Sequence, residues 1–196
     1  MILITGGTRS GKSEFAEQLA AKSGSRFLYM ATAKITDDEM AERVRRHRSR
    51  RSDAWHTHEG YVHLDRVLKE AEGQYDGILL DSVSTMVTNM IFEAIGDVDW
   101  EHFDYSKVDY KAIEDSALRA FEDIGQAAKK TDAPLVIVTD EIGLGVIPDT
   151  CLGRAFRDIL GIVNQLLAKL SDEVYFIVSG IPVKIKDESK IKGRLI

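Results

Sequence analysis

Short apolar runs recur along the chain and predict buried β-strands. They occupy residues 1–4, 27–30, 77–80, 135–138 and 174–178, and many of their side chains are β-branched. Strands that are covered on both faces read as continuous apolar runs of this kind, whereas half-exposed strands alternate apolar and polar positions. The pattern therefore predicts a mostly parallel sheet with helices on both faces.

Helical patterns separate these runs. Apolar residues at helical spacing predict helices over residues 13–21, 37–50, 61–71, 83–95, 110–130 and 154–170. Strands that alternate with helices are typical of an α/β fold. We expect one nucleotide-binding domain over residues 1–196, with a polar, charged tail at about 187–196. Residues 96–108 are polar and acidic with interleaved aromatic side chains, and we expect a surface excursion between two helices.

Composition narrows the class of protein without naming a function. The 196 residues are 44% apolar and 30% charged, as is ordinary for a globular protein. A net charge of -6 argues against general binding to nucleic acid or to a membrane surface. No apolar run is long enough to be inserted in a membrane. The single cysteine, Cys151, excludes an intramolecular disulfide and fits a reducing cytoplasm.

The segment GGTRSGKS matches the P-loop pattern G-x-x-x-x-G-K-[ST], between a predicted strand and a predicted helix. Its glycines let the backbone wrap a phosphate, and the helix N-terminus faces the anion. The lysine is expected to reach the outer phosphates and the last serine to bind Mg²⁺. The predicted nucleotide-binding residues of this loop are Gly6, Gly7, Thr8, Arg9, Ser10, Gly11, Lys12 and Ser13.

Acidic side chains follow two of the predicted strands, and a P-loop enzyme needs one of them near Mg²⁺. Asp81 ends the run at 77–80, while Asp140 and Glu141 follow the run at 135–138. Ligands bind at the carboxyl ends of strands in open α/β sheets. Asp81 is the favoured metal ligand, although it could instead cap the next helix, and Asp140 or Glu141 could take the metal role.

A dense basic stretch, RVRRHRSRR, spans residues 43–51 of this acidic chain. Such a run is usually a solvated helix face. Its position after the second predicted strand, at the edge where the P-loop lies, suits a polyphosphate, because arginine binds phosphate oxygens bidentately. His47 lies among these arginines, and its unperturbed pKa of ~6.5 leaves the ring largely neutral near pH 7. It could therefore attack a phosphorus atom and pass the group to a second substrate.

Longer motifs extend this signature over nearly the whole chain. Their sequences are ITGGTRSGKS, YMATAKITDDEMAERVRRHRSRR, W-x-T-x-E at Trp55, Thr57 and Glu59, LLDSVSTMVTNM, VTDEIGLGVIP, FRDILGIVNQLLA and VYFIVSGIPVKIK. Together and in this order they make the chain resemble the bifunctional adenosylcobinamide kinase/adenosylcobinamide-phosphate guanylyltransferases of cobalamin biosynthesis. The P-loop is shared with many enzymes, whereas the blocks around His47 and DEIGLGVIP are much more specific.

The resemblance implies a homotrimer with a RecA-like P-loop fold and two reactions. The enzyme would phosphorylate the corrinoid adenosylcobinamide with ATP or GTP. It would then transfer GMP from GTP to that phosphate through a guanylyl-histidine at His47, releasing pyrophosphate. Beyond the P-loop, the family's nucleotide-contacting positions fall on Thr32, Ala33, Lys34, Arg48, Ser49, Arg50, Arg51, Glu59 and Asp81.

Two departures and two alternatives accompany this assignment. Some relatives carry a second histidine where this chain has Arg46, and some carry Glu where it has Asp81. A plain P-loop kinase without nucleotidyl transfer is the rival enzyme. A RecA-like ATP-binding regulator or motor subunit is the rival from another class. The small size and the lack of an added partner domain argue against the second rival.

Overall fold

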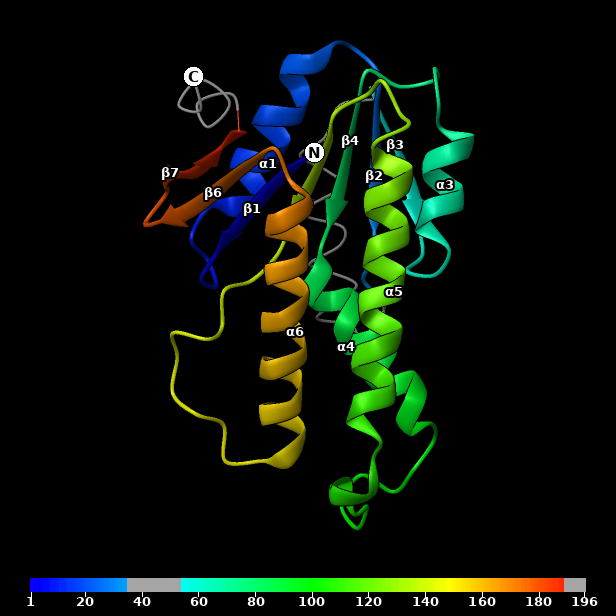
Figure 1. Cartoon of the computed structure of the whole chain (residues 1–196), viewed down its shortest axis with the longest axis vertical. Coiled ribbons are helices and arrows are strands. Elements are labelled where there is room, and N and C mark those ends of the chain that lie inside the picture. Colours follow the sequence, from blue (N-terminus) through cyan, green and yellow to red (C-terminus); the bar gives the residue numbers. More distant parts are fainter. Residues whose placement is uncertain (35–53, 189–196) are drawn as a thin grey trace, which may run out of the picture.

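A mostly parallel sheet organises the chain (Figure 1). The computed structural model describes residues 1–34 and 54–188. In that part of the chain the sheet has seven strands, in the spatial order β3 (Trp55–Glu59), β2 (Phe27–Ala31), β4 (Gly77–Asp81), β5 (Leu135–Val138), β1 (Ile2–Gly6), β6 (Glu173–Val178) and β7 (Ile181–Asp187). Each neighbouring pair is parallel except β6 and β7. The predicted α/β P-loop fold is confirmed.

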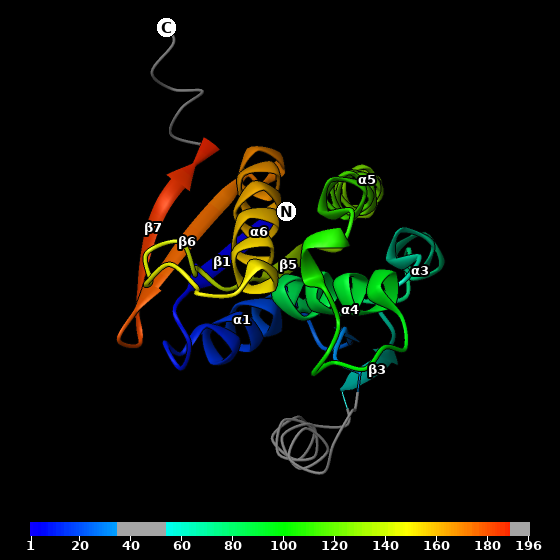
Figure 2. The same cartoon turned by 90° about the horizontal axis from the view of Figure 1, so that it is seen from below.

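Helices cover both faces of this sheet, as the continuous apolar strands require. One face of the sheet, which includes Ile4 and Leu79, packs against the helix α1 (Lys12–Ala20). The opposite face, which includes Leu3 and Leu80, packs against α3 (Leu64–Glu70), α4 (Val83–Ile95), α5 (Tyr110–Ala128) and α6 (Cys151–Leu170). Figure 2 shows α1 and α6 on opposite sides of β1. Neighbouring residues of one strand thus enter two separate cores.

The predicted elements are largely confirmed, with differences at the edges of the sheet. All five apolar runs are strands, and α4 has the predicted bounds. The prediction missed β3 and β7, and it began α6 three residues late. Two short 3-10 helices, η1 (Ala21–Ser23) and η2 (Tyr105–Lys107), complete the described elements. The helix predicted at 37–50 lies outside the described residues.

The remaining expectations concern the excursion and the tail. Residues 96–108 do connect α4 to α5 at the surface, at the lower end of the molecule in Figure 1. The tail expected from residue 187 begins too early, because β7 includes Asp187, and residues 189–196 lie outside the described part. Within the described ranges, none of the helices combines the length and apolar character that crossing a bilayer requires.

Candidate active site

The P-loop lies at the carboxyl edge of the sheet, between β1 and α1. Gly6 ends β1, and a side chain there would place its Cβ 2.6 Å from the carbonyl oxygen of Ile177. Gly11 has a φ of 95°, a left-handed conformation that favours glycine. A Cβ on Gly11 would lie 3.3 Å from Cα of Gly180, and the Gly180 N–H donates to the Ser10 carbonyl at 2.8 Å. The turn between β6 and β7 therefore braces the loop from outside.

Lys12 is the first residue of α1, and its side chain bends back over the loop. The ammonium contacts Asp140 Oδ1 at 2.6 Å and donates to the Gly7 carbonyl at 3.0 Å. The exposed fraction is 10% for the Lys12 side chain and 26% for that of Asp140. The pair is thus partly shielded from water. In such a shielded position the attraction between the two charges is stronger than on an open surface. The structure holds a positive charge at the mouth of the P-loop.

Asp140 follows β5, the strand next to β1, and a network of three elements fixes it. Its second carboxylate oxygen accepts a hydrogen bond from Ser84, in the first turn of α4. Its backbone carbonyl accepts from Asn164 Nδ2 of α6 at 3.0 Å, and Asn164 Oδ1 in turn accepts from the Thr139 hydroxyl at 2.7 Å. Among the acidic candidates, Asp140 is therefore the one that contacts Lys12.

Asp81 ends β4, one strand further from the P-loop than Asp140. Its Oδ2 accepts a hydrogen bond from the Tyr29 hydroxyl at 2.9 Å. The alternative role of Asp81 as a helix cap is wrong, because Ser82 is the N-cap of α4 and its hydroxyl accepts from the Thr85 N–H. Glu141, the third acidic candidate, accepts from the Gly143 N–H at 2.6 Å and so orders the loop after β5.

Thr32, Ala33 and Lys34 follow β2 at the same edge, and Thr32 is rigidly held. Its hydroxyl accepts from the Ser82 N–H at 2.8 Å and donates to the Ser82 carbonyl at 2.7 Å. Its carbonyl accepts from Asn89 Nδ2 at 2.7 Å. Thr32 is buried, Ala33 is half-buried and Lys34 is exposed. The chain thus leaves the sheet toward residue 35 from a fixed point.

Glu59 ends the edge strand β3, paired with Ala31 of β2, and it is exposed. Four strand spacings of about 4.8 Å separate β3 from β1, so Glu59 is roughly 19 Å along the edge from the P-loop strand. The structure therefore brings the P-loop, Asp140 and Asp81 together, and it places Glu59 at the far end of the same edge. His47, Arg48, Ser49, Arg50 and Arg51 lie outside the described residues.

Sequence reasoning missed the groups that orient the acidic residues. Tyr29, Ser84 and Asn164 each hydrogen-bond Asp81 or Asp140. Ser84 carries a weak signal, since a polar side chain in the first turn after a strand lies at the ligand edge. Asn164 is in the middle of α6, and Tyr29 is within an apolar strand. Their roles depend on which strands are neighbours.

Comparison with known proteins shows where this site belongs. Residues 2–185 match the family described as "Cobinamide kinase / cobinamide phosphate guanyltransferase". The chain is 45% identical to the "Bifunctional adenosylcobalamin biosynthesis protein CobU" of Escherichia coli strain K12 over 95% of its own length and 99% of the relative's. The protein of the same description from Salmonella typhimurium is also 45% identical over the same shares. The "Bifunctional adenosylcobalamin biosynthesis protein CobP" of Pseudomonas aeruginosa is 33% identical over 95% of this chain and 97% of that protein.

The match spans the structural site as well as the sequence motifs. It runs from β1, through the P-loop, Asp81 and Asp140, into β7. The strand order at the carboxyl edge and the Lys12–Asp140 pair supply the P-loop site that a nucleotide-dependent transferase needs. The chain belongs to the cobinamide kinase/cobinamide phosphate guanylyltransferase family, the enzymes that phosphorylate cobinamide and guanylylate the product in cobalamin biosynthesis.

Proposed function

We propose that the chain catalyses both reactions at the carboxyl edge of its sheet, with the P-loop, residues 6–13, as the triphosphate site for each. The observation that carries this proposal is the Lys12 ammonium, which is held 3.0 Å from the Gly7 carbonyl and 2.6 Å from Asp140. A charge fixed in a shielded site stabilises a transferring phosphoryl group without the cost of reorganising water. One lysine in that position can serve both transfers.

In the kinase step, the hydroxyl oxygen of adenosylcobinamide attacks the γ-phosphorus of ATP or GTP. The bond from that phosphorus to the bridging β–γ oxygen breaks, a nucleoside diphosphate leaves, and the hydroxyl proton is released. Lys12 and the backbone N–H groups of the P-loop would hold the oxygens on which negative charge accumulates. The product carries a phosphate that becomes the acceptor of the second step.

In the transferase step, we assign the nucleophile to His47. A neutral imidazole nitrogen attacks the α-phosphorus of GTP, the bond to the β-phosphate breaks, and pyrophosphate leaves. A phosphate oxygen of adenosylcobinamide phosphate then attacks the same phosphorus, the P–N bond breaks, and His47 is restored. The support is the arginine-rich setting of His47 in the sequence, the family match, and the fixed exit of the chain at Thr32 on the P-loop edge. Arg48, Ser49, Arg50 and Arg51 are the proposed phosphate-binding side chains beside it.

Mg²⁺ is the proposed cofactor, with Ser13 and Asp81 as the protein groups that would hold it. Their donors are a hydroxyl and a carboxylate oxygen, which are the ligands that Mg²⁺ prefers, together with water and substrate phosphates. The described residues contain no group of three or more His, Cys, Asp or Glu side chains that would form a metal cage. This agrees with an ion that is held largely by its nucleotide. When bound, the ion neutralises charge on the phosphates.

A homotrimer in the cytoplasm completes the proposal. Aliphatic side chains are exposed on the loop after β5 and on β7, which agrees with a subunit interface because large exposed apolar patches mark interaction sites. These side chains are Leu144, Val146, Ile147, Ile181, Val183 and Ile185. Sedimentation equilibrium would test the assembly, since a monomer or a dimer at micromolar concentration contradicts it.

The decisive experiment separates the two half-reactions in the purified protein. Incubation with GTP labelled at the α-phosphate should leave acid-labile, alkali-stable label on the protein. His47→Ala should lose that label and guanylyl transfer while keeping much of the kinase rate, with His56→Ala as the matched control at an exposed histidine of β3. Guanylyl transfer by His47→Ala at the wild-type rate would exclude the covalent step and favour a different mechanism. No labelling of the wild-type protein, with kinase activity intact, would support the plain kinase.

A further inference from the structure

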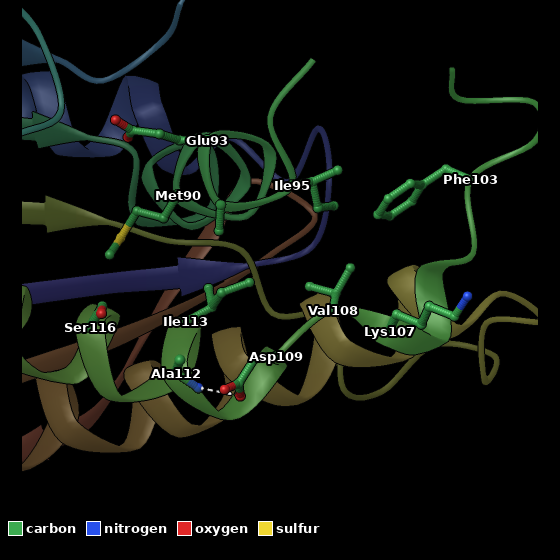
Figure 3. A pocket seen from close by; sticks show the side chains of 11 residues that line it. Met90, Glu93, Ile95, Phe103, Lys107, Val108, Asp109, Ala112, Ile113 and Ser116 are labelled. Carbon is green, nitrogen blue, oxygen red and sulfur yellow. Dashed lines mark hydrogen bonds between the residues drawn. The ribbon is translucent and has the colours of Figure 1, made fainter. Parts of the chain in front are cut away.

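A cavity opens between the end of α4, the excursion 96–108 and the start of α5 (Figure 3). Its volume is about 550 Å³, which falls in the range of small-molecule sites. Apolar side chains form most of its lining, among them Met90, Ile95, Phe103, Val108 and Ile113. Its remaining polar groups come from Glu93, Lys107, Asp109 and Ser116. Neither the nucleotide site nor the proposed chemistry uses any of these residues.

Aromatic rings extend this cavity along the excursion. Phe103 lines the cavity and lies 5.1 Å from Tyr105, whose ring stacks on Trp100 at 6.3 Å. Trp100 in turn meets Phe92 edge-on at 5.2 Å, and both of these side chains are more than 40% exposed. Large aromatic side chains usually bury most of their surface. An exposed group of them beside an apolar cavity indicates a surface for a large, flat, partly apolar ligand.

The helix α4 connects this cavity to the nucleotide site. Its first turn carries Ser84, which hydrogen-bonds Asp140, and its last turn carries Glu93 and Ile95 in the cavity wall. At 1.5 Å per residue, the cavity wall lies about 14–17 Å along the helix from Ser84. Figure 2, which looks at the carboxyl edge of the sheet, shows α4 leading from beside α1 to the excursion. A ligand in the cavity therefore approaches the P-loop from the side.

Charge favours one occupant. The excursion carries Asp97, Asp99, Glu101 and Asp104 against the single Lys107, and Glu93 and Asp109 add carboxylates at the cavity. A corrinoid is a broad ring with an apolar, methylated surface, a rim of amide groups and a net positive charge from its cobalt(III) ion. Such a ligand matches the aromatic group, the hydrogen-bonding side chains and the negative potential of this region.

We propose that the cavity and the aromatic group beside it bind the corrin ring of cobinamide, which leaves the flexible aminopropanol arm free to reach the P-loop. This inference rests on the proposed function and deepens it, because it says where the second substrate lies. The ring is larger than the cavity, so we assign the cavity to one edge of the ring and the exposed rings of Trp100 and Phe92 to its face.

Two variants of the full chain change the cavity in opposite ways. Phe103→Ala removes an aromatic wall, and Ala94→Phe fills the cavity from an exposed position without removing any core side chain. Each should raise the KM for adenosylcobinamide in the kinase step about tenfold, since one aromatic contact is worth about that factor. The KM for the nucleotide and the kcat at saturating corrinoid should stay within twofold of wild type. Glu122→Ala, at an exposed site on α5, is the control and should change neither KM.

Equilibrium dialysis with adenosylcobinamide measures the same contacts without turnover, and both cavity variants should bind it about tenfold more weakly. Wild-type affinity in both correctly folded variants would overturn the cavity assignment and leave the proposed function standing. Failure of the wild-type protein to bind adenosylcobinamide would overturn both. A loss of nucleotide binding in the variants, equal to the loss of corrinoid binding, would show a general structural defect and also refute the assignment.

Discussion

The contact between the P-loop and the β6–β7 turn predicts a specific cost for one added methyl group. Gly11 has a φ of 95°, and a Cβ there would lie 3.3 Å from Cα of Gly180, a backbone atom that cannot rotate away. A left-handed conformation costs an L-residue about 1–2 kcal/mol, and the close contact adds to this cost. Gly11→Ala should therefore lower the free energy of unfolding by about 2 kcal/mol. In a chain of this length that corresponds to a fall in Tm of roughly 4–8 °C.

The functional consequence of Gly11→Ala follows from the same contact. Relief of the contact requires the loop or the turn to move, and the Ser10–Gly180 hydrogen bond of 2.8 Å moves with it. The N–H groups that face the phosphates would shift, and small displacements of a binding group can change rates about a hundredfold when they reach 1 Å. For a shift of a few tenths of an ångström we expect nucleotide affinity to fall about tenfold, measured by isothermal titration calorimetry.

A second glycine supplies the matched control. Gly161 lies inside α6, where a Cβ would meet no atom within 4 Å. Alanine there should stabilise the protein by about 0.5–1 kcal/mol through helix propensity, with nucleotide affinity unchanged. If the contact acts as described, the change in the free energy of unfolding has opposite signs for the two substitutions. Equal Tm and equal nucleotide affinity for Gly11→Ala and wild type would refute the argument that the turn braces the loop.

Four further substitutions test the charges of the site and of a surface turn. Lys12→Ala should impair both half-reactions by at least about a hundredfold if one P-loop serves both, and loss of only one step would show two triphosphate sites. Asp140→Asn should lower the free energy of urea unfolding by about 1–2 kcal/mol because it leaves the Lys12 charge without its ion-pair partner. Asp81→Asn should raise the Mg²⁺ concentration that is needed for half of the maximal rate. The Ser25 and Arg26 N–H groups donate to Asp76 and hold the pKa of its carboxyl group below the usual value. The ionised Asp76 therefore stabilises the fold above pH ~3.9, the pKa in the unfolded chain, and this stabilisation is lost as the pH falls through the lower pKa of the folded protein. Asp76→Asn should therefore destabilise the protein at about pH 7 in urea unfolding, and the difference from wild type should shrink as the pH falls through the lowered pKa of Asp76. A difference that does not depend on pH would contradict this.

The sequence predicted the central strands and missed the two edge strands for one physical reason. Central strands are covered on both faces, so β4 and β5 are unbroken apolar runs. The edge strand β3 reads Trp-His-Thr-His-Glu and is largely exposed, and β7 begins IPVKIK, with a proline that only an edge tolerates. The residue patterns of β3 and β7 are too similar to those of loops for a strand to be predicted from them. Their pairing partners, not their own side chains, make them strands.

The P-loop could be predicted because it is local, whereas the pairing of its lysine could not. Eight consecutive residues carry the phosphate-binding geometry, and the strand before them and the helix after them are visible in the pattern. The contact between Lys12 and Asp140 depends on β5 being the neighbour of β1. Chain order places β4 and its Asp81 before β5, and the pattern of residues does not reveal which strand lies closer. The preference for Asp81 as metal ligand therefore stays a prediction.

The strand order suggests a division of labour along the carboxyl edge. Asp140 contacts Lys12, the lysine that we assign to the phosphates, while Thr32, which follows β2, stands about three strand spacings, roughly 14 Å, from β1. The chain that leads to His47 therefore departs well to one side of the P-loop, from a threonine that Ser82 and Asn89 hold in place. In-line attack on the α-phosphorus requires approach from the side opposite the leaving pyrophosphate, whose phosphates the P-loop would enclose. We propose that His47 approaches from the β2 side, which would leave the γ-phosphorus accessible to the cobinamide hydroxyl. In this proposal, a triphosphate bound at one site would react at its γ-phosphorus in the first step and at its α-phosphorus in the second.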